Sequence, residues 1–268
     1  MKGEAMKRFY LLLVIGFACL ILAGCGPSAE EIMKETMRAS KEVKTAHFKE
    51  KWQIKLPRAP IQEGKVQKQN YLYESEGDVD YRTGDMKVKT DIAPGVQATA
   101  MKIGEKLYVQ LGGKWYEMPQ SFQLPAPVSQ ALSISQYLKY FKELKKEGGT
   151  KIDGEACYHV KGVPNMEALV KLPGVTDLLK DPSGQQVRTV DDLKNIKASF
   201  DFFIQKKNMY FKASREKTEF PASEELIKLG YAEAGDKVKG DVEVTLSDFN
   251  KKLNLQVPSN VQPWPVQD

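Results

Sequence analysis

Apolar and polar residues alternate from Phe48 to Leu56, so this part of the chain suits a structure with two unlike faces. Successive side chains of a β-strand point to opposite faces of a sheet, and the alternation therefore predicts a half-buried strand. Similar segments bounded by turn residues predict further strands, with an antiparallel meander in the first half. Their ranges are 65–76, 78–81, 86–92, 96–103, 106–111, 114–118, 156–163, 196–205, 209–220 and 237–250, with 253–257 extending the sheet edge.

Other segments predict helices that lie beside the sheet. Ser28, followed three residues later by Glu31, matches a capping box, in which two side chains bond the free backbone N–H groups of a helix start. Residues 165–180 have a helical pattern but contain Pro173, which breaks helices, so they predict two short pieces. Residues 223–232 fit either a short helix or a loop.

A further helix is predicted in the middle of the chain. Ser133 and Gln136 form a second capping box, and Gly148-Gly149 would end this helix. Between them, apolar residues recur at helical spacing and form a stripe. The stripe consists of Ile134, Tyr137, Leu138, Phe141 and Leu144.

The predicted strands and helices together indicate an α+β protein with one large antiparallel sheet. One face of this sheet is apolar, and the few helices must cover it. The sequence leaves open whether the helices fill that face or leave a hollow. The candidate cavity-lining residues are Phe48, Trp52, Ile54 and Leu56 on the first strand, and Tyr137, Leu138 and Phe141 on the middle helix.

The amino-terminal segment 9–23 contains no charged residue and follows three basic ones, Lys2, Lys7 and Arg8. A helix needs about 20 apolar residues to span a bilayer comfortably, and this segment is shorter. A basic region, an apolar region and then small residues are typical of an export signal. An uncleaved membrane anchor is the alternative.

Leu22-Ala23-Gly24-Cys25 resembles the lipobox of bacterial lipoproteins. The resemblance implies cleavage between Gly24 and Cys25, with a diacylglyceryl group and acyl chains such as palmitate on the Cys25 thiol; a plain secretory signal is the alternative. Several acyl chains hold a protein firmly, so we expect it on the extracytoplasmic face of the cell membrane. The expected organisation is a signal peptide over 1–24, a lipidated tether over 25–27, a single domain over 28–257 and a loosely ordered tail over 258–268.

Reactive side chains are scarce, because the chain has two histidines and three cysteines. Cys19 would leave with the signal and Cys25 would carry lipid, so Cys157 remains as a single thiol and no intramolecular disulfide can form. There is no nucleotide-binding loop, metalloprotease helix, Gly-x-Ser-x-Gly elbow or Cys-x-x-Cys motif. We therefore expect no enzyme, no metal site and no cofactor besides the covalent lipid. With 40 basic against 35 acidic residues, no nucleic-acid partner is expected either.

Glu74, Glu76, Asp78 and Asp80 would share one face of an extended segment, unless Gly77 breaks the alternation. Carboxylates grouped in this way could bind calcium, which takes oxygen ligands in flexible geometry. The same spacing suits a solvated strand face whose charges prevent pairing with another sheet edge, and this is the favoured interpretation.

Cys157 and His159 lie two residues apart on a predicted strand, a spacing that allows a nucleophile pair in principle. Side chains on one face of a strand do not converge, and no third orienting group is evident, so we expect no catalysis. His47 lies on the polar face of the first strand. Some lysines could either touch anionic lipid head groups or form an ordinary surface: Lys49, Lys51, Lys55, Lys142, Lys145 and Lys146.

Three segments carry a family resemblance: 104–118 (GEKLYVQLGGKWYEM), 154–162 (GEACYHVKG) and 244–258 (VTLSDFNKKLNLQVP). With the lipobox and the helix after it, they resemble the LolA/LppX-like lipoproteins, especially the LppX/LprG branch and related lipoproteins of Gram-positive bacteria. The resemblance implies a curved antiparallel half-barrel whose concave apolar face is closed by helices around a cavity for acyl chains. It implies no catalytic residues.

Two functions are compatible with these features. The leading hypothesis is a lipid-anchored protein that binds or carries a lipid or another hydrophobic molecule in its half-barrel. The alternative is an interaction or sensory module that binds an envelope protein through its polar face.

Overall fold

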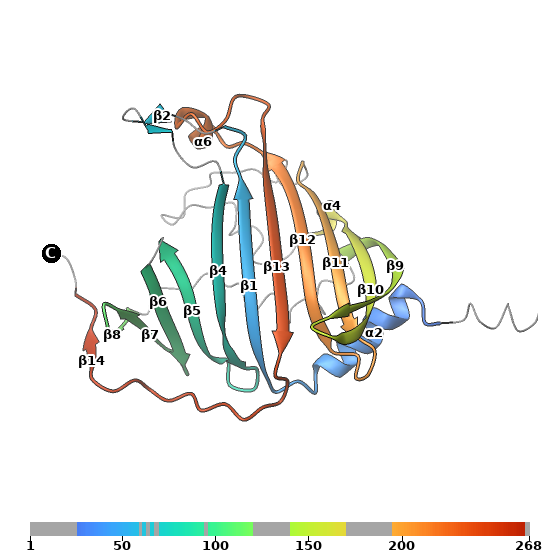
Figure 1. Cartoon of the computed structure of the whole chain (residues 1–268), viewed down its shortest axis with the longest axis horizontal. Coiled ribbons are helices and arrows are strands. Elements are labelled where there is room, and N and C mark those ends of the chain that lie inside the picture. Colours follow the sequence, from blue (N-terminus) through green and yellow to red (C-terminus); the bar gives the residue numbers. More distant parts are fainter. Residues whose placement is uncertain are drawn as a thin grey trace, which may run out of the picture.

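The computed structural model describes residues 26–58, 61–62, 65–66, 70–93, 96–119, 140–169 and 195–265. Within these ranges a curved, open sheet of 12 strands dominates, and every neighbouring pair except β14–β8 is antiparallel (Figure 1). The strand order is β14-β8-β7-β6-β5-β4-β1-β13-β12-β11-β10-β9. The strands are β1 Thr45–Lys55, β4 Asn70–Asp80, β5 Asp85–Ala93, β6 Val96–Ile103, β7 Lys106–Leu111, β8 Lys114–Glu117, β9 Phe141–Ile152, β10 Glu155–Pro164, β11 Lys197–Gln205, β12 Phe211–Pro221, β13 Lys237–Ser247 and β14 Val261–Pro263.

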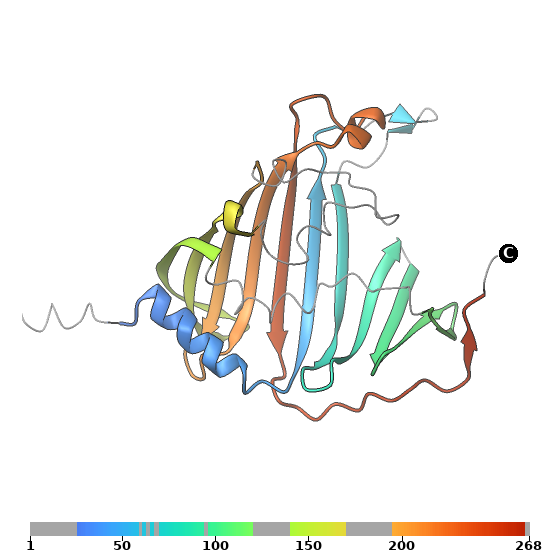
Figure 2. The same ribbon diagram turned by 180° about the vertical axis from the view of Figure 1, so that it is seen from behind.

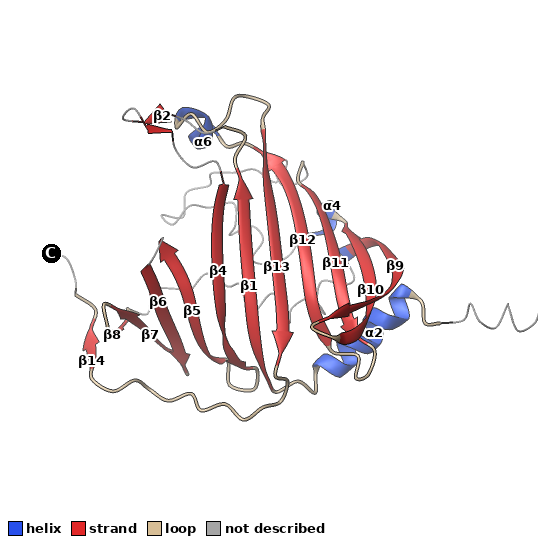
Figure 3. Ribbon diagram, viewed as in Figure 1, coloured by secondary structure: helices blue, strands red, loops and turns tan. Residues whose placement is uncertain are grey.

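Helices are few in the described part of the chain (Figure 3). They are α2 Ala29–Ser40, α4 Met166–Leu169 and α6 Glu224–Lys228. Two very short strands, β2 Ile61–Gln62 and β3 Lys65–Val66, form a separate pair. The predicted α+β fold with one large antiparallel sheet is confirmed.

Strand β1 joins the two halves of the sheet, because it lies between β4 and β13. Phe48 on β1 faces Gly77 on β4 and Leu246 on β13, with no register shift along either pair. Side-chain bonds reinforce the junction at its end: the Lys44 N–H donates to Asn250 Oδ1 at 2.6 Å, and Thr45 Oγ1 donates to the Lys251 carbonyl at 2.6 Å. The first and last long strands are therefore neighbours at the centre of the sheet.

Helix α2 begins at a capping box, as the sequence predicts. The Ser28 N–H donates to Glu31 Oε2 at 2.7 Å, and the Glu31 N–H donates to Ser28 Oγ at 3.1 Å. Ile32 and Met33 on α2 are buried against one face of the sheet, which we call the inner face (Figure 2). The opposite face is the outer face. The strands contribute these residues to the shared core: Ala46, Phe48, Val79, Val160, Phe202, Ile204, Phe211, Val244 and Leu246.

The prediction that the middle helix continues over 141–149 is wrong, because this range belongs to strand β9. The register between β9 and β10 shifts twice, and each shift leaves an extra residue on β9, at Lys142 and at Glu147. Such β-bulges bring side chains three residues apart to the same face. Phe141 and Leu144 consequently both pack against the core, and their spacing resembles a helix in the sequence.

Other boundaries differ from the predictions in smaller ways. Strand β4 runs unbroken through Gly77, where the sequence predicts two segments. Residues 253–257 form no strand, whereas the tail contains β14, and the Trp264 ring contacts the Tyr116 ring edge-on at 5.7 Å. Helix α6 lies within the ambiguous range 223–232.

The predicted helical cover is described only in part. Helix α4 accounts for the start of the helical range 165–180, and the rest of that range beyond residue 169 lies outside the described residues. Closure of the whole inner face by helices stays a prediction.

Candidate functional site

The inner face of the sheet changes from filled to exposed along strand β1. Phe48 is 1% exposed and belongs to the core that contains α2. Four residues further along the same face, Trp52 is 36% exposed, and its register partner Tyr73 on β4 is 45% exposed. We call this region, with Trp52, Ile54, Tyr73 and Val242, the open end of the inner face. The described elements thus leave large aromatic side chains uncovered there.

The structure separates the predicted cavity-lining residues. Two of them, Phe48 and Phe141, lie in or against the filled core. Two others, Trp52 and Ile54, lie at the open end, and Leu56 just beyond β1 is 7% exposed. The remaining predicted site residues, Tyr137, Leu138, Gly24 and Cys25, lie outside the described residues.

A carboxyl group interrupts the apolar inner face between its filled and open ends. Glu50 lies on β1 between Phe48 and Trp52 on that face, and it is 5% exposed. Burial raises the pKa of the Glu50 carboxyl, while hydrogen bonds from the Trp52 and Ser75 side chains partly oppose this change. The Ser75 hydroxyl donates to Glu50 Oε2 at 3.4 Å. The Glu50 carboxyl group is therefore shielded from water, and the groups that donate hydrogen bonds to it are neutral.

A second carboxyl group lies on the inner face at Glu216 of β12. Its register partners are Val242 on β13 and Phe200 on β11, both apolar. Burial raises the pKa of the Glu216 carboxyl to about 7. The sequence pattern does not distinguish this residue from other strand carboxylates, although Ser214, Glu216 and Thr218 alternate in the strand and share a face with the apolar residues of β13.

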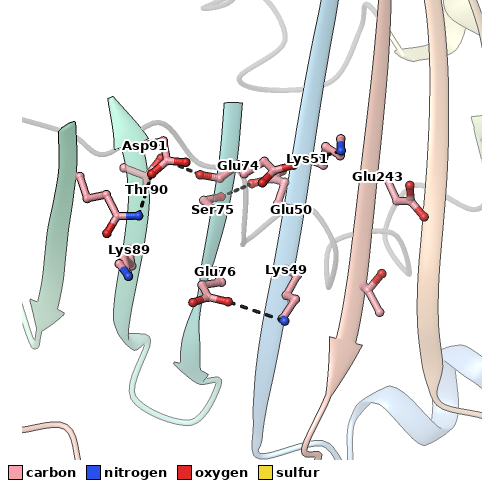
Figure 4. Close-up of a pocket in the computed structure, with 12 residues that line it drawn as sticks. Lys49, Glu50, Lys51, Glu74, Ser75, Glu76, Lys89, Thr90, Asp91 and Glu243 are labelled. Atoms are coloured by element: carbon pink, nitrogen blue, oxygen red, sulfur yellow. Dashed lines mark hydrogen bonds and ion pairs between the residues drawn. The ribbon is translucent and has the colours of Figure 1, made fainter. Parts of the chain in front are cut away.

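The outer face carries rows of opposite charges instead of apolar groups. Lys51 Nζ lies 3.0 Å from Glu74 Oε1, and Arg215 Nε lies 3.1 Å from Glu243 Oε1. Because Lys51 and Glu243 are register partners, these four residues form one row across β4, β1, β13 and β12. A groove of about 410 Å³ on this face is lined mainly by charged and polar residues (Figure 4). The described residues that line it are lysines, carboxylates, hydroxyls and an amide, with no hydrophobic residue among them.

The row of carboxylates on β4 is paired rather than free to bind calcium. Glu74 pairs with Lys51, and Glu76 pairs with Lys49 at 3.7 Å. The other two pairs are Asp78 with His47 at 3.0 Å and Asp80 with Arg82 at 2.5 Å. Over the described ranges, no group of three or more His, Cys, Asp or Glu residues could hold a metal ion. These pairs support the solvated-face interpretation.

Cys157 and His159 share the outer face, as their spacing predicts, but they do not form a nucleophile pair. Cys157 is fully buried, and burial raises the pKa of its thiol, which disfavours the reactive thiolate. His159 Nε2 instead lies 2.7 Å from Asp201 Oδ1, and its ring stacks on Phe203 at 4.9 Å. The two side chains therefore have separate structural partners.

The lysines of the mispredicted helix lie on strand β9. Lys146 Nζ donates to the Pro27 carbonyl at 2.9 Å and lies 5.6 Å from the centre of the Tyr158 ring. This contact fixes the start of the described chain beside β9. Among the described helices, none has the length and apolar character needed to cross a membrane.

Comparisons with known proteins identify a family and a fold. DUF6612, described as a family of unknown function, matches residues 28–263. No curated protein matches the chain. Among solved structures, LprF from Mycobacterium bovis is similar with a TM-score of 0.50 and 14% identity over 86% of this chain and 96% of LprF.

Two further solved structures are less similar in shape. The lipoprotein LppX from Mycobacterium tuberculosis gives a TM-score of 0.45 and 13% identity over 84% of this chain and 96% of LppX. A LolA superfamily protein from Nitrosomonas europaea gives a TM-score of 0.30 and 11% identity over 85% of this chain and 96% of that protein. At 14% identity, the likeness to LprF shows a shared fold, which agrees with the curved antiparallel sheet expected from the sequence resemblance.

Proposed function

Because this chain belongs to DUF6612, a family of unknown function, we propose from its own geometry that it binds a lipid or another hydrophobic molecule. The molecule lies on the open end of the inner face. The protein acts as a lipoprotein held by Cys25 on the extracytoplasmic side of the cell membrane. The observation that carries the proposal is the exposure of the Trp52 and Tyr73 side chains on a face that is mainly apolar.

The exposed aromatic side chains on the inner face support binding for an energetic reason. Each square ångström of apolar surface removed from water contributes about 25 cal/mol, so an acyl chain laid over Trp52 and Tyr73 is stabilised there. Contiguous apolar patches are uncommon on soluble surfaces unless they bind something. The charged groove on the outer face lacks this property, which favours the inner face as the site.

The test is identification of bound molecules by native mass spectrometry, using the full chain extracted from membranes with a mild detergent. We expect a bound hydrophobic molecule in wild type and its loss in Trp52→Glu. The matched control is Leu72→Glu, because Leu72 is 53% exposed but lies on the outer face of neighbouring β4. A wild-type protein that carries no hydrophobic molecule, or carries only a stoichiometric protein partner, would contradict the proposal.

The anchor gives a separate prediction. In Cys25→Ala, we expect no incorporation of labelled fatty acid and accumulation of the unprocessed precursor, because the thiol that receives the diacylglyceryl group is missing. Metabolic labelling and the electrophoretic size of the product measure both effects. Cys157→Ala is the control, since Cys157 is buried in the sheet. Normal labelling and processing of Cys25→Ala would rule out lipidation at this position.

A further inference from the structure

Two carboxyl groups lie beside the open end of the inner face, one on each side of strand β13. Glu50 on β1 faces Val244, and Glu216 on β12 faces Val242. Trp52 faces Val242 from the other side, so the exposed aromatic residue and Glu216 share the same row across the sheet. A molecule over Trp52 therefore lies close to both acids, because Glu50 is on the same strand and Glu216 is two strands away. Neighbouring strands are about 4.8 Å apart.

The acids of the inner face differ from those of the outer face in their partners. On the outer face, Glu74, Glu76 and Glu243 each pair with a lysine or an arginine. On the inner face, neither Glu50 nor Glu216 pairs with a cation from any described residue; Glu50 accepts hydrogen bonds from neutral groups only. Within the described part of the chain, these outer acids thus have cationic partners, whereas Glu50 and Glu216 have none.

Among the described residues, the side chains next to the two acids on the inner face cannot supply that charge. Around Glu216 these groups are Phe200, Val242, Ser214 and Thr218. Around Glu50 they are Ser75, Val244, Phe48 and Trp52. None of these side chains titrates in the physiological range. A buried carboxyl group without a charged partner is costly, so a bound molecule that supplies hydrogen-bond donors stabilises it, and a bound anion destabilises it.

We propose that the inner face selects an amphiphile whose head group carries hydrogen-bond donors and no negative charge, with Glu50 and Glu216 as the accepting groups. This inference rests on the proposed function, because it assigns the head group of the molecule whose chain lies over the open end. Hydroxyl and ammonium head groups share the required chemistry. Burial raises the pKa of both carboxyl groups, which agrees with the assignment.

Three probes share a dodecyl chain and differ in their head group, so they separate the effect of the head group from that of the alkyl chain. They are dodecylglycerol, dodecylammonium and dodecyl sulfonate. None changes its charge between pH 5.5 and 8.5. Binding to the full chain, stripped of bound molecules, is measured by calorimetry at pH 8.5. We expect the glycerol and ammonium probes to bind at least roughly tenfold more tightly than the sulfonate. On lowering the pH to 5.5, sulfonate binding should strengthen and ammonium binding should weaken, because Glu216 becomes protonated.

The variant Glu50→Gln/Glu216→Gln should reduce the preference against sulfonate to less than about threefold and remove its pH dependence. The control Glu74→Gln/Glu243→Gln removes two outer-face acids and should keep the wild-type preference. Circular dichroism checks that both variants fold; if the double variant does not, Glu216→Gln alone must show the smaller preference. Equal binding of all three probes to wild type overturns this inference but leaves the proposed function intact. Failure of all three probes to bind overturns the proposed function itself.

Discussion

Replacing Gly77 with alanine is expected to lower the free energy of unfolding by about 3 kcal/mol or more, or to prevent folding. A Cβ atom at this position would lie 2.0 Å from the Lys87 carbonyl oxygen and 3.0 Å from Phe48 Cε1. The carbonyl belongs to the backbone of β5, which pairs with β4, and Phe48 is 1% exposed in the core. Neither neighbour can move without disturbing the centre of the sheet. Urea denaturation followed by circular dichroism measures the effect.

Gly149→Ala is the matched control, because Gly149 also lies within a strand and its backbone dihedral is ordinary. The nearest atom to its Cβ would be Lys206 Nζ at 2.9 Å, the far end of a flexible side chain that can turn aside. We expect a change within about 1 kcal/mol. If Gly77→Ala were as stable as Gly149→Ala, the close approach of β4 and β5 in the structure would be incorrect.

Glu216→Gln is expected to stabilise the protein at pH 8 by at most ~3 kcal/mol and to have little effect near pH 5. Burial raises the pKa of Glu216 from 4.5 to about 7 in the folded protein. Between pH 4.5 and about 7, the folded protein therefore keeps a proton on Glu216 that the unfolded protein has released. Stability from this residue is fully present below pH 4.5 and is lost as the pH rises through 7. Glutamine stays neutral and removes the loss.

The measurement is the urea midpoint of wild type and variant at several pH values between 4.5 and 8.5. The control is Glu243→Gln, which removes a carboxylate of similar position on β13 that pairs with Arg215 on the outer face. We expect Glu243→Gln to lack the stabilisation that Glu216→Gln gives at pH 8. A difference between Glu216→Gln and wild type that does not grow with pH would show that Glu216 is solvated.

The alternation of residues predicts the sheet well, because burial of one face imposes a period of two along every strand. The ranges predicted for β6 and β7 agree with the structure at both ends. The capping box at Ser28 is equally local, since its partners are three residues apart, and it also agrees. Features that depend on neighbouring residues in the sequence are thus predictable from it.

Features that depend on pairing between residues distant in the sequence cannot be predicted in this way. The bulges of β9 arise from its register with β10, and no residue in β9 reveals that register alone. The role of Gly77 depends on Lys87 and Phe48, which reach it from other strands. Of the cavity-lining residues predicted on β1, Trp52 and Ile54 lie at the open end of the inner face, whereas Phe48 lies in the buried core. Glu216 was missed because its apolar surroundings come from β11 and β13.

Because β13 lies at the centre of the sheet, the sheet cannot be completed until late in synthesis. Synthesis delivers β1 early and β13 late, and the bond between Lys44 and Asn250 joins residues 206 positions apart. Until β13 is added, one edge of β1 has no partner, and such long-range pairing makes folding slow. A premature stop codon after β12 would therefore remove a strand from the middle of the sheet rather than from its margin, and β1 and β12 would lose the neighbour that they share.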